Sequence, residues 1–572
     1  MTFAYDYDYI IIGAGLAGTV LASTLHTKLP TTTILILEAG EDRYAHPLTT
    51  EPLKTPQTHH SDLDWNLTTV PQPHLSNRTC YQAAGKAVGG STAMQNGTWT
   101  RGPKVDYDRW ATLVGDARWS WNALQAYFPK TETRSVEADG GGGGGGGARS
   151  SFSAPTPRTV VTATPGQSHS ARVYGLRGAV LGGWVGGAGV GIVGDADAGF
   201  PVGVSERVES WDRGRRQMVH RVFGLDGVQV LTKSRVARIV VQRGEEGSGM
   251  MVATGVELVG GARFSAKKEV ILSAGAYHSP KILMLSGIGP GEKLRSAGVQ
   301  QSVESPYVGR NFHDHLAVPI AWKLKGEKQG MNRSLAEMMK DPVLKLGWPS
   351  DWIVFAGLER SVVKASIEKD GGHLNNPSSQ LLLNPSCVFT ETMNFYVPTG
   401  TDIAGMDTPM DGTCVSSTIL AVSPTSRGEI NISSPDPLAP PDINPNYYAT
   451  ELDRAAIRTG IRKAFEVYQG SESLKDVIEC EVPPAGYEPL TATSTDEEID
   501  ERVRRVGITS FNPAGSCSMG RVVDAELRVH GVKGLRIVDA SAIPLPLAAH
   551  LQVAVYALAA RAADFIVARH RA

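Results

Sequence analysis

Apolar residues along the first forty positions fall in an order that predicts a strand, a turn, a helix and a second strand. The run YIII at residues 9–12 is followed by the glycine-rich GAGLAG at 13–18. Next come TVLASTLHT at 19–27, with helix-like spacing, and ILILEAG at 34–40. Short apolar runs bounded by glycine are typical of buried strands. Residues 8–40 are therefore predicted to form one β-α-β unit.

Similar patterns recur later in the chain. Residues 228–240 (VQVLTKSRVARIV) and 268–274 (KEVILSA) are predicted strands. Near the end, GLRIVDAS at 534–541 is a predicted strand with an acidic residue at its exit, and residues 550–570 repeat apolar positions at helical spacing. Between about 305 and 505, proline and polar loops interrupt the apolar pattern, so this middle region is expected to cap a site.

Two glycine-rich stretches have a different character. The unbroken run Gly140–Gly147 maximises backbone entropy and cannot form a core, which predicts a flexible surface insertion. The stretch Gly178–Val193 is apolar, but its 16 residues fall short of the roughly 20 that a membrane span requires. We expect it to be part of a soluble fold, without a membrane partner.

Size and charge narrow the functional class. The chain has 572 residues, well beyond the roughly 250 to 300 at which one hydrophobic core stops growing, so two or more interleaved domains are expected. The formal net charge is −2, and lysine and arginine are dispersed. Nothing supplies the basic stripe that binding to a phosphate backbone requires, which excludes nucleic acid as an expected partner.

Cysteine spacing and the first residues bear on the compartment. Five cysteines, at positions 80, 387, 414, 480 and 517, lie far apart without CxxC pairs, which disfavours a zinc site and a disulfide framework. The opening MTFAYDYDYIIIGAG carries two acidic residues where a signal peptide has basic ones. These features predict a reducing, cytoplasmic environment.

The first predicted turn carries a dinucleotide-binding pattern. Gly13, Gly15 and Gly18 give G-x-G-x-x-G between strand and helix, where missing side chains let the backbone approach a pyrophosphate. Glu38 follows 20 residues later at the end of the next strand, where a carboxylate can accept hydrogen bonds from ribose hydroxyls. The pattern predicts a dinucleotide and leaves NAD and FAD open.

Longer segments resemble one family. GAYHSPKILMLSGIG at 275–289, GKAVGGST at 85–92 and the C-terminal NPAGSCSMG…GLRIVDASAIPLPLAAH resemble the glucose–methanol–choline (GMC) oxidoreductases, which are FAD enzymes. The resemblance implies an α/β fold, α+β overall, with a Rossmann-like FAD-binding domain and a discontinuous substrate-binding domain that contains an antiparallel sheet. It favours FAD over NAD.

The resemblance also implies how the chain is divided. FAD-binding parts are expected at 1–135, 228–304 and 510–572, the last also catalytic; substrate-domain parts at 151–227 and 305–509; and the glycine-rich insertion at 136–150.

Cofactor residues can be carried over one position at a time. Gly13, Leu16, Ala17 and Glu38 would hold the ADP half, with Gly15 and Gly18 completing the turn, and Val236 would meet the adenine through its backbone. Ser91, Gln95, Asn96 and Gly97 would lie along the pyrophosphate and the flavin edge. The family usually has asparagine where Gln95 stands, so that contact is altered. Asp539 and Ala540 would take the ribityl and pyrophosphate side.

Histidine placement bears on how the flavin is held. Some relatives bond a histidine near position 95 to the flavin, but none occurs from Ser91 to Gly97, so non-covalent FAD is expected. His313 and His315, in VGRNFHDH, lack further clustered ligands, which favours a structural role and no metal.

The resemblance assigns the chemistry to Asn512 and His550. The family commonly has histidine at the first position, whereas asparagine neither accepts a proton near neutral pH nor carries charge. Asn512 can therefore only orient the substrate, and His550 becomes the base, because an unperturbed imidazole titrates near pH 6.5. A helix dipole behind His550 is expected to keep it neutral.

These residues predict an FAD-dependent oxidoreductase that converts an alcohol to a carbonyl and passes electrons to dioxygen or another acceptor. Aromatic residues of the middle region favour an aromatic or polyketide-type substrate; they are Trp348, Trp352, Phe355, Phe389, Phe395 and Tyr396. Loss of the usual histidine leaves open a non-redox cyclase or isomerase that retains FAD as a scaffold. A flavin-binding protein without catalysis is a third possibility, and the oligomeric state is left open.

Overall fold

The first apolar run forms β1 (Asp6–Ile12), the central strand of a sheet in the computed structural model. The structure describes residues 6–134, 159–163, 172–244, 250–400 and 406–571, so the glycine run Gly140–Gly147 lies outside the described residues. Helix α1 (Leu16–Lys28) and strand β2 (Ile34–Leu37) follow, and β1 and β2 pair in parallel. The predicted β-α-β unit is confirmed.

This first sheet has eight strands drawn from three distant parts of the chain. Its main path runs β11 (Gln229–Leu231), β2, β1, β14 (Arg263–Leu272), β13 (Met251–Leu258) and β12 (Val236–Arg243), while β26 (Val532–Lys533) pairs with β13 and β27 (Leu535–Ile537) with β14. The strands beside β1 are parallel, whereas β12, β13 and β14 are antiparallel. Continuous apolar runs suit the parallel strands because helices cover both faces of such sheets.

The prediction of one strand over 228–240 is wrong. The chain forms β11, turns, and re-enters the sheet at its far edge as β12. Lys233 between them has a φ of 53°, in the left-handed region that extended strands do not use. The four residues between the two strands, 232–235 (TKSR), are all polar, so the apolar pattern is interrupted where the chain turns.

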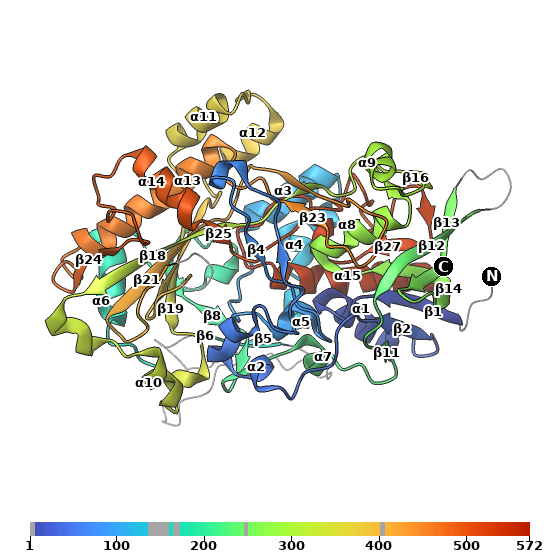
Figure 1. Ribbon diagram of the computed structural model, residues 1–572, viewed down its shortest axis with the longest axis horizontal. Helices are drawn as coiled ribbons and strands as arrows, with labels where there is room; N and C mark the ends of the chain where they lie inside the picture. Colours follow the sequence, from blue (N-terminus) through green and yellow to red (C-terminus); the bar gives the residue numbers. More distant parts are fainter. Residues whose placement is uncertain (1–5, 135–158, 164–171, 245–249, 401–405, 572) are drawn as a thin grey trace.

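The middle of the chain builds a second, antiparallel sheet of seven strands. They are β7 (Gly203–Glu206), β18 (Leu316–Leu324), β19 (Ser350–Ala356), β20 (Thr390–Phe395), β21 (Cys414–Ala421), β24 (Ile478–Val482) and β25 (Ile508–Thr509). In Figure 1 the two sheets lie toward opposite ends of the long axis of the molecule. The predicted fold class, a dinucleotide-type α/β unit joined to an antiparallel sheet, is confirmed.

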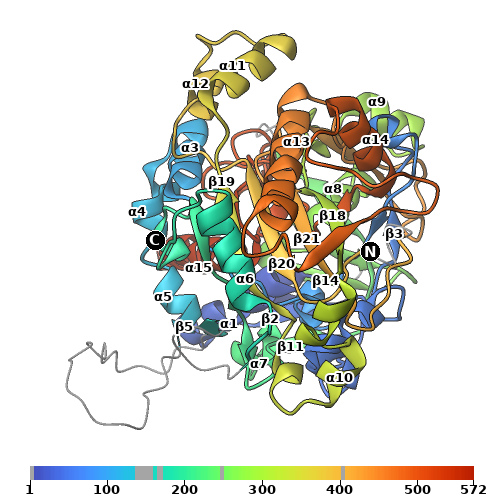
Figure 2. The ribbon, with the colours of Figure 1, turned by 90° about the vertical axis from the view of Figure 1, so that its left-hand side faces the viewer.

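Helices cover both sheets. The last helix, α15 (Gln552–Arg571), packs against α1 beneath the first sheet, and α8 (Gly275–Leu285) packs against β12. Helix α13 (Glu451–Phe465) packs on β20 and β21, and Figure 2 shows it together with α6 (Arg177–Gly182) in front of the antiparallel strands. Each sheet therefore has its own core of buried apolar side chains.

The apolar stretch Gly178–Val193 is broken in the structure. It begins in α6, continues as one π-helical turn over Gly183–Gly187, and then becomes irregular. Among the described residues, every helix is too short or too polar to cross a bilayer.

Candidate active site

Two glycines of the first turn are required by close packing. Gly13 has a φ of 104°, and a Cβ there would lie 2.5 Å from the carbonyl oxygen of Ser273. A Cβ on Gly18 would lie 2.1 Å from the carbonyl oxygen of Gly13. Helix α1 begins just after this turn, and its N-cap residue, Gly15, provides no side-chain cap. The first N–H groups of the helix thus remain available to an anionic ligand.

Glu38 stands directly after β2 with its side chain buried. Its Oε2 accepts a hydrogen bond from the Ala14 N–H at 2.9 Å, and its Oε1 accepts one from the Gly40 N–H at 2.8 Å. Burial raises the pKa of this carboxyl, and the backbone donors oppose that effect. The carboxylate therefore ties the glycine turn to the end of β2.

One cavity of about 710 Å³ connects this turn to the C-terminal residues. Fourteen of the fifteen residues predicted for the site line it: Gly13, Gly15, Leu16, Ala17, Glu38, Ser91, Gln95, Asn96, Gly97, Val236, Asn512, Asp539, Ala540 and His550. Gly18 does not line the cavity, and its contact with Gly13 places it in the packing between helix and strand instead. Positions more than 500 residues apart are thus brought together.

Sequence reasoning missed several lining residues at the dinucleotide end. Trp65, Arg235 and Lys281 line the cavity beside Val236. Burial lowers the pKa of Arg235, and it lowers that of Lys281 to about 8, so both side chains are cationic at neutral pH. Two cations near an uncapped helix start favour a negatively charged ligand. Lys281 lies within the segment 275–289 that carries the family resemblance, but neither it nor Arg235 was assigned a ligand role from the sequence.

Asp539 is buried, and protein donors occupy its carboxylate. Oδ2 accepts from Gly275 N–H at 2.9 Å and Ser279 Oγ at 2.6 Å, while Oδ1 accepts from the N–H and hydroxyl of Ser541. A carboxylate has about four acceptor positions. Asp539 thus holds the start of α8, and any ligand contact at this residue falls to its backbone.

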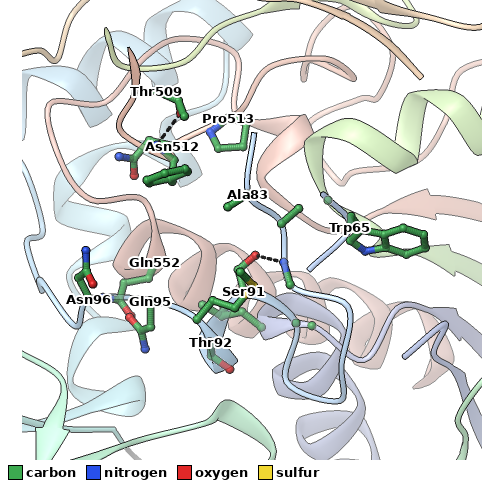
Figure 3. A pocket seen from close by; sticks show the side chains of 18 of the residues that line it. Trp65, Ala83, Ser91, Thr92, Gln95, Asn96, Thr509, Asn512, Pro513 and Gln552 are labelled. Atoms are coloured by element: carbon green, nitrogen blue, oxygen red, sulfur yellow. Dashed lines mark hydrogen bonds between the residues drawn. The ribbon is translucent and has the colours of Figure 1, made fainter. Parts of the chain in front are cut away.

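The turn from Ser91 to Gly97 forms another wall of the cavity. Ser91 Oγ accepts from the Gly85 N–H at 3.1 Å, and a Cβ on Gly97 would lie 2.5 Å from the indole nitrogen of Trp211. Gln95 Oε1 is buried and has no hydrogen-bond partner among the described residues. Figure 3 shows Ser91 and Gln95 across the cavity from Asn512. The unpaired amide oxygen is available to a ligand donor.

His550 is paired with a residue that sequence analysis did not identify. Its Nε2 lies 2.9 Å from Oε1 of Glu391, which is fully buried in β20, and its backbone N–H donates to Thr100 Oγ1 at 2.7 Å. His550 lines the cavity and Glu391 does not, so the carboxylate lies behind the ring. An ionised carboxylate only accepts, so against an ionised Glu391 the ring nitrogen Nε2 carries the proton and Nδ1 is left as the acceptor. The only sequence feature that could have indicated Glu391 is that it is a lone acidic residue inside a buried strand.

The helix dipole is expected to act on His550, and the structure also places a carboxylate beside the ring. His550 precedes α15 by two residues, so it lies outside the helix, and its ring contacts the Glu391 carboxylate directly. The positive end of a helix disfavours a protonated ring, whereas a carboxylate in contact stabilises one. The two groups therefore act on the ring in opposite senses.

Asn512 uses its amide to hold backbone. Its Oδ1 accepts from the Leu551 N–H at 3.1 Å, and its Nδ2 donates to the Ser510 carbonyl oxygen at 2.8 Å. The amide therefore joins the loop before Pro513 to the residue that follows His550.

The loop that carries Asn512 is anchored by Asp314, another residue that the motif search passed over. Its buried carboxylate accepts from the Asn512 N–H at 2.8 Å, from Thr509 Oγ1 and from the Tyr447 hydroxyl. The flanking His313 and His315 are fully buried, and burial lowers the pKa of both, that of His315 to about 3. In the described part of the chain, neither belongs to a group of three residues that could hold a metal.

The part of the cavity away from the dinucleotide end is lined by many apolar side chains together with uncharged polar ones such as Thr399, Thr418 and Gln552. Its lining includes Leu53, Leu335, Met339, Trp348, Met393, Phe395, Met410 and Leu420. Of the aromatic residues considered from sequence, Trp348 and Phe395 line the cavity, whereas Trp352, Phe355, Phe389 and Tyr396 pack elsewhere in buried cores. Among the described lining residues the charged ones are Glu38, Arg235, Lys281 and Asp539, all at the dinucleotide half.

Comparison with known families gives a consistent result along the chain. Two family models described as GMC oxidoreductase match, an N-terminal one over residues 7–317 and a C-terminal one over residues 424–559.

Individual relatives match over almost their full length. A GMC-type oxidoreductase of Aspergillus aculeatus, acuG, is 35% identical over 568 residues, which cover 98% of this chain and 99% of that protein. An oxygen-dependent choline dehydrogenase of Burkholderia ambifaria is 31% identical, with 99% and 94% covered. Among solved structures, a formate oxidase of Aspergillus oryzae superposes with a TM-score of 0.83 at 26% identity over 100% of both chains, and its FAD is described as modified.

Proposed function

The chain belongs to the GMC oxidoreductase family, and we propose that it is an FAD-dependent enzyme that oxidises an aromatic or polyketide-type alcohol to a carbonyl compound. The observation that carries the proposal is the His550–Glu391 pair at the wall of the cavity that begins at the glycine turn. The electron acceptor is dioxygen or a second small molecule.

The residues present fit FAD. A Cβ on Gly90 would lie 2.7 Å from the Cα of Gly15, so these two backbones leave no room for side chains beside the start of α1. Glu38, Arg235 and Lys281 supply one acceptor and two cations at that end, and the cavity extends from there to His550. Gly13, Leu16, Ala17, Val236 and Glu38 would hold the ADP half, and Ser91, Asn96, Gly97 and Ala540 the remainder. When bound, FAD supplies the hydride acceptor.

The chain's own residues provide proton transfer and orientation. His550 Nδ1 takes the hydroxyl proton of the alcohol, and Glu391 holds the ring and stabilises its protonated form, as the acid of a catalytic triad does. Asn512 fixes the backbone on either side of the base. One imidazole is therefore enough for proton transfer, because Asn512 only has to hold the backbone around the base in place.

The lining of the cavity supports a neutral, apolar substrate. Formate is an anion and choline a cation, and ions of either kind require a counter-charge when they are desolvated. The cavity half beside His550 presents thioethers, aromatic rings and aliphatic side chains, and its charged lining residues lie at the other half. A benzylic or polyketide-derived alcohol matches this surface.

We further propose that the FAD is bound without a covalent bond. The turn from Ser91 to Gly97 contains neither histidine nor cysteine. Acid precipitation should therefore leave the yellow chromophore in the supernatant, whereas a yellow pellet would contradict this part of the proposal.

Product mass tests the reaction class. Purified enzyme is incubated with a panel of benzylic and polyketide alcohols without oxygen, and both the visible flavin absorbance and the product mass are followed. Oxidation predicts bleaching together with loss of two hydrogens. An unchanged mass or the loss of water, with the flavin still oxidised, would contradict the proposal and favour a cyclase or isomerase.

A further inference from the structure

A further cation, Arg216, lies buried behind the wall of the cavity. Arg216 belongs to the short strand β10 (Arg215–Arg216), and its side chain is 2% exposed, while that of the adjacent Arg215 is exposed. The guanidinium donates through Nε to the Gln95 carbonyl oxygen at 3.1 Å and through Nη1 to the Ala93 carbonyl oxygen at 2.6 Å. It also donates to the Leu48 carbonyl oxygen and to Thr55 Oγ1.

This guanidinium has no counter-charge within the described residues. The other arginines that are at most 2% exposed are paired: Arg172 and Arg207 with Glu209, Arg502 with Glu481 and Arg536 with Glu269. Arg216 is bonded only to uncharged oxygens and lies 5.3 Å from the ring centre of Trp211. Burial lowers its pKa to about 9, so it remains charged at neutral pH. An unpaired buried charge is costly, and such groups concentrate at functional sites.

Arg216 lies directly behind residues that line the cavity. Thr55 and Gln95, which it contacts, line the cavity, as do Met94, Asn96 and Gly97 in the same turn. The end of this turn is joined to the last helix by Gln552, which lies two residues after His550. Its Nε2 donates to the Thr98 carbonyl oxygen at 2.6 Å. The guanidinium therefore lies one layer behind the wall that faces the base.

We propose that Arg216 is a built-in cation that stabilises the negative charge gained by the bound flavin on reduction, and so raises the flavin's reduction potential. This inference rests on the proposed binding of FAD in the cavity. Two-electron reduction adds negative charge to the flavin ring. The charge of a buried, unpaired cation is screened far less by water and salt than that of a cation in solvent.

The direct test is the reduction potential of three variants, measured against reference dyes without substrate. Arg216→Gln removes the charge. Arg216→Lys keeps the charge but lacks the planar guanidinium with its several hydrogen-bond donors. Arg215→Gln removes a neighbouring charge that lies in solvent. Arg216→Gln should lower the equilibrium constant for reduction about tenfold, equal to about 30 mV for a two-electron couple. Arg216→Lys and Arg215→Gln should stay close to wild type, although Arg216→Lys also loses stability.

A second pair of variants applies if Arg216→Gln does not fold. Thr55→Asp keeps the guanidinium and places a carboxylate against it, and Thr55→Asn is its uncharged isostere. The aspartate variant should have the lower potential of the two, by a similar tenfold effect.

The outcomes separate this inference from the proposed function. Equal potentials in Arg216→Gln and Arg216→Lys, or in Thr55→Asp and Thr55→Asn, would overturn the role of Arg216 while leaving alcohol oxidation intact. A protein that binds no FAD would overturn the proposed function first.

Discussion

Glu391 shows how one buried side chain can define the role of another. Its carboxylate lines no part of the cavity, yet it is 2.9 Å from the nitrogen of His550 and fixes which ring nitrogen is basic. Groups that hold a catalytic histidine from behind typically set its orientation and its protonation preference.

Replacing Glu391 by glutamine should slow turnover without releasing the flavin. The amide oxygen can still accept from Nε2, but the charge that stabilises the protonated ring is lost, so kcat should fall by up to about 10⁴-fold, the effect of the same carboxylate-to-amide change in a catalytic triad. Steady-state kinetics with flavin content as the control provide the measurement, and Glu391→Asp should recover part of the rate. Wild-type turnover in Glu391→Gln would show that the contact is only structural.

Asn512 is expected to contribute to stability as well as to rate. In Asn512→Ala the Leu551 N–H loses its acceptor in a buried site, which should cost about 1–3 kcal/mol of unfolding free energy. Denaturant unfolding of the flavin-loaded protein measures this, with Asn122→Ala, at an exposed helical asparagine outside the cavity, as the comparison. A variant as stable as wild type would mean that the hydrogen bond carries no weight.

At the residue scale, the sequence predicted the main residues that line the cavity but not the buried residues that hold them in place. Asn512 and His550 were placed from short motifs, and both line the cavity. Glu391, Asp314 and Arg216 were missed because their partners lie 159, 198 and 121 residues away along the chain. No local pattern records a contact of that kind, and only the fold brings the groups together.

At the element scale, the junction of β1 and α1 sets the shape of the dinucleotide end. Gly18 allows the helix to approach the carbonyl of Gly13, and a methyl group there would lie 2.1 Å from that oxygen. The helix would have to move away from the strand, taking the cavity wall with it.

Gly18→Ala should therefore lose both stability and flavin. Overpacking of this kind typically costs about 1–3 kcal/mol. Gly178→Ala is the matched control, since a Cβ at that helical position meets nothing within 4 Å and should stabilise by about 0.5–1 kcal/mol. Flavin-to-protein ratio and thermal midpoint are the readouts, and a fully loaded Gly18→Ala enzyme would contradict the packing argument.

Helices and strands could be predicted from the sequence where glycine marks their ends. The first β-α-β unit is bounded by glycine and was predicted within a few residues. The break between β11 and β12 was not, because Lys233 turns the chain with a left-handed φ that no glycine announced. The antiparallel sheet came from the family resemblance, since its strands are spread over 307 residues, from Gly203 to Thr509, and interrupted by loops.

At the scale of the whole molecule, buried neutral histidines connect stability to pH. Burial lowers the pKa of His315 from 6.5 to about 3, and the electrostatic interaction with nearby His550 adds to the effect. Below pH 6.5 the unfolded chain takes up a proton at this residue that the folded chain refuses. His315 therefore makes folding less favourable as pH falls from about 6.5 to 3.

The variant His315→Gln should remove this dependence. Between pH 7 and pH 5 the wild type should lose about 2 kcal/mol of unfolding free energy relative to the variant. Other titrating groups are shared by both proteins and cancel in the difference. Denaturant titrations at the two pH values measure it, and parallel changes in both proteins would show that His315 titrates normally.

The molecule as a whole joins a dinucleotide-binding sheet to a substrate-capping sheet, and His550, in the loop before α15, is supported by Glu391 of β20 in the second sheet. The account depends on that ring accepting the alcohol proton. Its most direct test is the rate of flavin bleaching after anaerobic mixing with a reactive alcohol, compared between wild type and His550→Gln at equal flavin content. A fall of about 10²- to 10⁴-fold is predicted, the usual contribution of a positioned base; bleaching at the wild-type rate would contradict it.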